Sequence, residues 1–108
     1  MEREYQNAEK KYFTITGTFY RYGLEIFEKG QIVTLRKDPE NEHDREAIKV
    51  LMDGLGQVGW VANSVHTVKG ESFSAGRLYD KIGDTEFAEV VYILPDAVLA
   101  VVKEDLKM

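Results

Sequence analysis

The residues best suited to chemistry lie in one short acidic stretch, "LRKDPENEHDREAIKV", between Leu35 and Val50. It gathers five carboxylates, one amide and one imidazole: Asp38, Glu40, Glu42, Asp44, Glu46, Asn41 and His43. Such side chains can ligate a metal ion, transfer protons, or accept hydrogen bonds from a ligand. They can equally cap and shape a turn. Apolar runs on both sides place the stretch in a loop between two strands.

The spacing within this stretch does not fit the known metal loops. A calcium loop of the EF-hand type needs oxygen ligands at alternate positions and a glycine at the sixth. Counted from Asp38, the second residue is Pro39 and the sixth is His43. A magnesium-dependent hydrolase needs converging carboxylates, whereas neighbours in one loop mostly point to solvent. A hydrolase built on Asp38, Asp44 and His43 therefore rests on residue types alone, and we expect no metal or other cofactor.

Turn chemistry accounts for part of the acidic stretch. Pro39 presets the backbone angle of a turn. Asn41 tolerates left-handed backbone geometry, and the carboxylate of Asp44 can accept hydrogen bonds from the amides that follow it. These roles explain the residue types but not the length of the loop. A ligand-binding function for the loop therefore stays open.

The composition restricts the class of protein. The 108 residues suffice for one domain with its own hydrophobic core. The chain has no cysteine, which excludes disulfides, thiolate metal sites and a cysteine nucleophile. No apolar run approaches the ~20 residues of a membrane span, and the first residues are too charged for a secretory signal. We expect a cytoplasmic protein without a membrane partner.

The charge of the chain is acidic but uneven. The net charge of −5 argues against a protein that binds nucleic acid through general electrostatic attraction. Residues 82–108 hold six acidic and two basic residues, whereas residues 12–81 hold ten acidic and nine basic ones. The central section could therefore present a basic face although the whole chain is acidic.

The strands that must position the acidic loop are indicated by short alternating runs rich in β-branched and aromatic residues. We expect strands at residues 12–20, 31–37, 47–52, 57–62, 86–94 and 97–104. "DGLG" and "PD" are typical of tight turns between them. This rhythm favours a small barrel or sandwich, with a polar leader over residues 1–11 and one domain over residues 12–104.

One segment, "NSVHTVKGESFSAGRLYDKIG", interrupts the strand rhythm. It predicts a short helix over residues 75–82, capped by Ser72 or Ser74 and ended by Gly83. In such a helix Leu78 and Ile82 would point inward. Arg77 and Lys81 would then share one exposed face, four residues apart: a plain closing helix and a phosphate-contacting stripe are both compatible with this pattern.

The acidic stretch and the following "GQVGWVAN" resemble the signature of the HIRAN domain family. That signature has a leucine, a basic residue, D/E-P-x-N-x-x-D, A-I-x-V and G-x-x-G followed by an aromatic residue. The matching positions are Leu35, Asp38, Pro39, Asn41, Asp44, Ala47, Ile48, Val50, Gly56, Gly59 and Trp60. "TGTFYRYG" upstream also fits, so the resemblance covers about residues 12–95. The segment after Asn63 is similar to that of short, free-standing bacterial members.

The resemblance implies a mainly β fold, a small OB- or SH3-like β-barrel with one or two short helices inserted. In eukaryotes the domain precedes SWI/SNF-type helicases that remodel stalled replication forks, where it binds single-stranded DNA at its free 3′ end. The resemblance therefore implies a non-catalytic nucleic-acid-binding module for single-stranded DNA or 3′ ends, in DNA repair or replication processing. A helicase or nuclease would be a fitting protein partner.

The resemblance also assigns roles to residues. Asp44 would accept a hydrogen bond from the terminal hydroxyl, Asn41 would hold the loop or meet a base edge, and Tyr20 would stack on a base. The motif would be shaped by Asp38, Pro39 and Gly59. Other candidates for stacking or phosphate contacts are His43, Trp60, Arg21, Arg36, Lys37, Asn63, Lys69, Arg77 and Lys81.

A second reading keeps the fold and changes the ligand. The acidic C-terminal section and the exposed strand edges of a small barrel could meet a basic protein partner. The chain would then be a protein-interaction adaptor. A basic groove beside Tyr20 and Asp44 would favour DNA, whereas a uniformly acidic surface would favour the adaptor.

Overall fold

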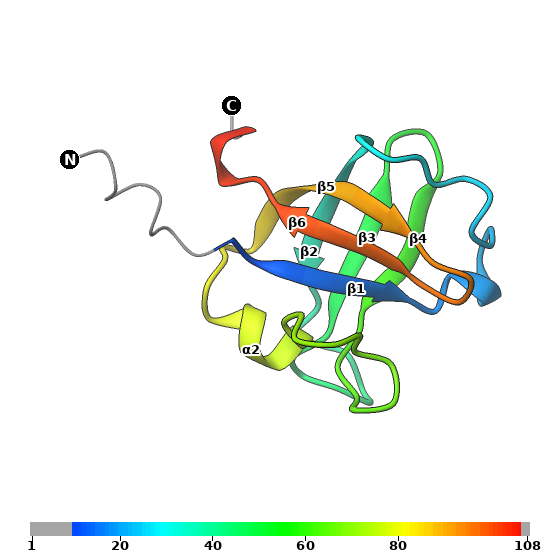
Figure 1. Ribbon diagram of the computed structural model, residues 1–108. Helices are drawn as coiled ribbons and strands as arrows, with labels where there is room; N and C mark the ends of the chain where they lie inside the picture. The colour runs from blue at the N-terminus through cyan, green and yellow to red at the C-terminus, as the bar shows by residue number, and fades with distance from the viewer. Residues whose placement is uncertain (1–9, 107–108) are drawn as a thin grey trace.

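Alternating buried and exposed residues form six antiparallel strands, which close into a barrel in the computed structural model (Figure 1). The structure describes residues 10–106. The strands are β1 Tyr12–Thr16, β2 Ile32–Lys37, β3 Ile48–Met52, β4 Gly56–Val61, β5 Thr85–Ile93 and β6 Val98–Val102. Their order around the barrel is β1-β4-β3-β2-β5-β6. Closure leaves no long unpaired edge, and it confirms the predicted small, mainly β barrel.

The short helices are one α-helix, α2 (Ala75–Tyr79), and two 3₁₀ turns, η1 (Thr18–Tyr20) and η2 (Glu104–Leu106). Ser74 caps α2, because its hydroxyl accepts a hydrogen bond from the Arg77 amide at 3.2 Å. The helix ends at Tyr79 rather than at Gly83, so the predicted range of 75–82 was too long. None of these helices has the length and apolar character that a bilayer span requires, as far as residues 10–106 show.

The barrel is filled by apolar side chains from every strand. The largest fully buried ones are Phe13, Ile15, Leu35, Ile48, Leu78, Val33, Val50, Val58, Val90 and Val98. Leu78 and Ile82 point into this core, as predicted, so that the α2 segment covers one open end of the barrel (Figure 1). The acidic loop, which joins β2 to β3, lies at the same end, since Asn63 hydrogen-bonds both Asp44 of the loop and Gly76 of α2.

The first strand is shorter than the sequence pattern indicates. The prediction of a strand over residues 12–20 is wrong beyond Thr16, because Gly17 adopts the left-handed φ of 75° and the chain enters η1. The glycine is needed for space as well, since a Cβ atom there would lie 3.0 Å from Cδ1 of Trp60. Gly17 therefore lies in close contact with the indole ring of Trp60. The domain limits of 12–104 stay a prediction, and residues 1–9 of the expected leader lie outside the described residues.

Candidate nucleic-acid interface

The acidic loop is closed by hydrogen bonds within itself. The Asp38 amide donates to the carbonyl oxygen of Ala47 at 2.9 Å, which joins the two ends of the loop. Oδ1 of Asn41 accepts from the amides of His43 and Asp44 at 2.9 and 3.0 Å, and its Nδ2 donates to Asp38 at 3.2 Å. The side chain of Asn41 is therefore engaged inside the loop. Of the two roles expected for Asn41, the structure supports holding the loop.

The carboxylate of Asp44 is fixed from two sides. Its Oδ1 accepts from the Glu46 amide at 2.9 Å, and its Oδ2 accepts from Nδ2 of Asn63 at 2.8 Å. Oδ1 of Asn63 accepts in turn from the Gly76 amide at 2.8 Å, at the start of α2. A carboxylate oxygen can accept two hydrogen bonds, so Asp44 is held in place and can still accept one from a ligand.

Trp60 lies on the outer face of the barrel rather than in the core. Within the sheet, Trp60 of β4 pairs with Thr16 of β1 on one side and with Lys49 of β3 on the other. The side chains of both partners are also half-buried. Gly59, its neighbour, faces inward opposite Val50, where a Cβ atom would lie 2.8 Å from the Thr16 carbonyl oxygen. The glycine thus lets β4 approach β1 closely and places the indole of Trp60 beside the acidic loop.

A hollow of about 410 Å³ lies between the loop, the end of β1 and the end of β4. Its lining residues are Thr16, Asn41, His43, Asp44, Ala47, Trp60, Val61, Asn63 and Ser64. We call this hollow the loop pocket. It brings together five of the predicted site residues, including the aromatic ring of Trp60 and the fixed carboxylate of Asp44. The link between Asp44 and Asn63 was not predicted, because nineteen positions separate them in the sequence.

The other predicted residues lie apart from the loop pocket. Arg36 lines a separate hollow beside the β3–β4 turn, and Arg21 is exposed at the end of η1. Lys37 donates to the carbonyl oxygen of Ile82 at 2.8 Å, and its Nζ lies 4.5 Å from the centre of the Tyr79 ring. Lys37 therefore anchors the segment after α2.

Two cations were expected on one face of the helix, and only one of them lies near the site. Arg77 is exposed, stacks 4.4 Å from the centre of the Phe73 ring, and lines a hollow that shares Asn63 and Ser64 with the loop pocket. Lys81 follows the end of α2, so the predicted helical face shared by Arg77 and Lys81 does not form. Tyr20 ends η1, and its side chain lies outside the described part of the structure.

No group of three or more histidine, aspartate or glutamate side chains in residues 10–106 is arranged to hold a metal ion. The acidic residues of the loop instead point in different directions. Glu40 and Glu42 line a neighbouring shallow hollow, which shares only Asn41 with the loop pocket. Asp44 is therefore the one carboxylate that lines the loop pocket.

The sequence model of the HIRAN domain matches residues 9–69, which is more than half of the chain. The chain belongs to the HIRAN domain family. No curated protein and no solved structure matched the chain. The matched residues include the whole acidic loop, Trp60 and Asn63, and they end before α2. HIRAN is a DNA-binding module, so membership supports nucleic-acid binding as the general class of function.

Proposed function

We propose that this HIRAN domain is a non-catalytic module that binds single-stranded DNA at free 3′ ends. The observation that carries the proposal is the loop pocket, where a half-buried indole and a fixed carboxylate face the same space. An unstacked terminal base can pack against Trp60. The hydroxyl at the end of the strand can donate to Asp44. A duplex interior offers neither group, which explains a preference for ends and single strands.

The position of Asp44 gives the proposed site its selectivity. A hydrogen bond from a hydroxyl to an ionised carboxylate is short and strong. A 3′ phosphate would bring negative charge against Asp44 and could not donate when ionised. Asn63 holds the carboxylate at 2.8 Å, so the group does not have to be ordered when the ligand arrives. The expected ligand therefore ends in a 3′ hydroxyl.

The charge around the loop pocket determines how strongly the proposed binding depends on salt. Of the predicted cations, Arg77 lies nearest to the loop pocket, because the hollow that Arg77 lines shares Asn63 and Ser64 with it. His43 lines the loop pocket itself. Few cations contact the strand in this arrangement, so the salt dependence of the affinity is expected to be shallow but measurable. The proposed setting is DNA repair or replication processing in the cytoplasm, with a helicase or nuclease as protein partner.

The adaptor reading has less support from the arrangement of charges. Among the described residues, several C-terminal acids are paired with lysines of the same chain. Asp96 lies 2.8 Å from Lys69, and Glu89 lies 3.7 Å from Lys103. These pairs reduce the negative potential that a basic protein partner would recognise. The DNA-binding proposal therefore stands first.

The proposal can be tested by fluorescence anisotropy with a labelled single strand at low salt. Strands that end in a 3′ hydroxyl or a 3′ phosphate are titrated with the protein and with Asp44→Asn. We expect the wild type to prefer the hydroxyl end and the variant to lose this preference. Asp53→Asn, at an exposed position of the β3–β4 turn, is the charge-matched control. Equal affinity of the wild type for both ends would overturn the proposed end recognition.

The same titration separates binding from hydrolysis. A repeat with added Mg²⁺ should leave the labelled strand intact, because Asp44 is the only carboxylate that lines the loop pocket. Cleavage that requires Mg²⁺ and disappears in Asp44→Ala would instead establish the hydrolase reading.

A further inference from the structure

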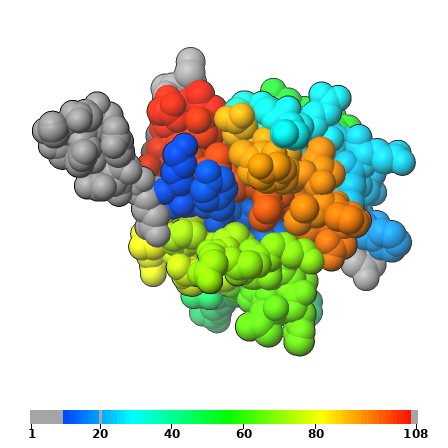
Figure 2. All heavy atoms as spheres, in the orientation of Figure 1, coloured from blue at the N-terminus to red at the C-terminus, as the bar shows by residue number. Residues whose placement is uncertain are grey.

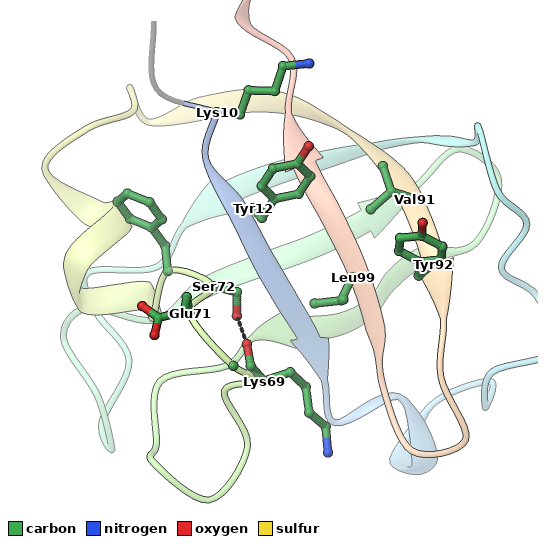
Figure 3. Close-up of a pocket in the computed structure, with 10 residues that line it drawn as sticks. Lys10, Tyr12, Lys69, Glu71, Ser72, Val91, Tyr92 and Leu99 are labelled. Atoms are coloured by element: carbon green, nitrogen blue, oxygen red, sulfur yellow. Dashed lines mark hydrogen bonds between the residues drawn. The ribbon is translucent and has the colours of Figure 1, made fainter. Parts of the chain in front are cut away.

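A second hollow, of about 490 Å³, lies on the outer face of β1, β6 and β5 (Figure 3). Tyr12 of β1 and Tyr92 of β5 stand on this face with Leu99 of β6, which pairs with Tyr92. The tyrosines are 42% and 58% exposed, so both rings are accessible beside an apolar floor. Lys10 and Lys69 lie at opposite ends of the hollow. We call it the tyrosine groove.

The tyrosine groove is linked to the loop pocket by a third hollow, which shares lining residues with both. This hollow, of about 380 Å³, shares Gly70 and Ser72 with the tyrosine groove. It also shares Asn63 and Ser64 with the loop pocket. Arg77 lines this connecting hollow. The three hollows therefore follow residues 63–74, a segment that lies directly beneath the exposed part of β1 in Figure 2.

The segment between the two sites is fastened to the barrel. The hydroxyl of Ser72 lies 2.9 Å from that of Thr14, and both residues are buried. The amide of Lys69 donates to the Thr14 hydroxyl at 3.1 Å, and Ser72 donates to the Lys69 carbonyl oxygen at 2.7 Å (Figure 3). These hydrogen bonds fix the floor of the path before any ligand binds, which lowers the entropic cost of binding.

The side chains along the path suit a single strand of nucleic acid. Aromatic rings that stack on successive bases, combined with cations that follow the backbone, are the usual composition of such sites. Here the exposed rings are Tyr12 and Tyr92, and the cations along the path are Lys10, Lys69 and Arg77. Nζ of Lys29 also lies 5.3 Å from the centre of the Tyr92 ring, which leaves the other face of that ring for a base. One acid, Glu71, also lines the tyrosine groove.

We propose that a strand whose 3′ end occupies the loop pocket continues past Arg77 into the tyrosine groove, where its upstream bases stack on Tyr12 and Tyr92. This inference rests on the proposed function. It adds a multi-nucleotide footprint to the end site and explains how an acidic protein holds a strand: most of the contact is stacking. An apolar peptide would occupy the tyrosine groove alone, and it would not account for the hollow that links this groove to the loop pocket.

The ion pair of Lys69 provides an independent test of the proposed path of the strand. Its ammonium group now lies 2.8 Å from the carboxylate of Asp96, in the turn between β5 and β6. A phosphate in the tyrosine groove would compete with Asp96 for that ammonium group. Removing the carboxylate by Asp96→Asn should therefore raise the affinity for long strands severalfold and leave that for a dinucleotide unchanged.

The test compares the affinities of oligonucleotides with a free 3′ hydroxyl, from a dinucleotide to a dodecanucleotide. We expect affinity to rise as the strand is extended at its 5′ side. Tyr92→Ala should lower the affinity for the longest strand about tenfold, which corresponds to one lost stacking contact, and should not affect the dinucleotide. Tyr22→Ala, another exposed tyrosine outside all three hollows, is the matched control and should bind like the wild type.

The outcomes separate this inference from the proposed function. A dinucleotide that binds, without any gain from longer strands, overturns the footprint alone and leaves the tyrosine groove for a peptide. An unchanged affinity of Tyr92→Ala for the longest strand does the same. Failure of every oligonucleotide to bind overturns the proposed function and this inference with it. Unchanged thermal unfolding of Tyr92→Ala confirms that any loss arises at the groove.

Discussion

Gly59→Ala is the substitution whose effect follows most directly from the geometry behind Trp60. A Cβ atom at this position would lie 2.8 Å from the carbonyl oxygen of Thr16 and 2.9 Å from Cγ2 of Ile15. Both distances are shorter than the contacts that a Cβ atom makes with an oxygen or carbon atom in folded proteins. The first partner is backbone, and the second is a fully buried side chain in the core. β1 and β4 must therefore move apart, and Trp60 must move with β4.

The expected cost combines two opposing effects. Overpacking of a filled core destabilises proteins by about 1–3 kcal/mol, and two contacts below 3.0 Å on rigid partners place Gly59→Ala in the upper part of that range. Replacing glycine also restricts the unfolded chain, which offsets about 0.4–1 kcal/mol. The net loss of unfolding free energy is about 2 kcal/mol. For a domain of this size that lowers the Tm by roughly 10 °C.

The loss can be measured by thermal and guanidinium unfolding. Trp60 is the only tryptophan in the chain, so its fluorescence reports on the barrel and on the loop pocket together. Gly83→Ala is the matched control, because its Cβ atom would lie 3.9 Å from the nearest atom, the carbonyl oxygen of Thr85. We expect the control to equal or slightly exceed the wild-type Tm, because it restricts the unfolded chain without a clash in the folded protein. If Gly59→Ala were as stable as Gly83→Ala, the tight contact between β1 and β4 would be refuted.

Three further predictions concern side chains around the site. Asn63→Ala removes the donor to Asp44, so it should lower the affinity for a 3′-hydroxyl strand and destabilise the fold by about 1 kcal/mol, as anisotropy and urea unfolding can show; wild-type affinity would contradict this role. Lys37→Met should lower the Tm without changing strand affinity, because the ammonium group is engaged within the protein; an affinity loss at unchanged stability would restore its predicted phosphate contact. The hydrogen bond from Lys69 lowers the pKa of Asp96 from its usual value, so the stabilisation from this pair is present at neutral pH and is lost as the pH falls through that lowered pKa. An NMR titration should find a higher Asp96 pKa in Lys69→Met, and an unchanged value would show that the pair does not persist in solution.

The fold and the acidic loop were largely readable from the sequence, because both depend on local patterns. Alternating residues determine which face of each strand is buried. Strands β2 to β6 lie within two residues of their predicted limits, whereas β1 ends four residues early, at Thr16. The loop residues Asp38, Asn41 and Asp44 hydrogen-bond within a few positions of one another, as turn chemistry predicts.

The remaining features depend on contacts between distant parts of the chain. Lys37 was expected at a phosphate, but the fold brings the Ile82 carbonyl oxygen within 2.8 Å of it. The helix ends at Tyr79, yet Ile82 still packs in the core, because so short a helix has little stability of its own and packing decides its length. The tyrosine groove joins Tyr12 and Tyr92, which only the intervening strand β6 makes neighbours.

The most direct test of the central claim, that the loop pocket binds the end of a single strand, is an NMR titration of the ¹⁵N-labelled protein with a 3′-hydroxyl oligonucleotide. We predict that the largest shifts occur at the indole N–H of Trp60 and at the amides of Asp44, Asn63 and Gly76. The amides of the β3–β4 turn should not move. Shifts confined to other faces of the barrel, with the Trp60 signal unchanged at saturation, would contradict the account.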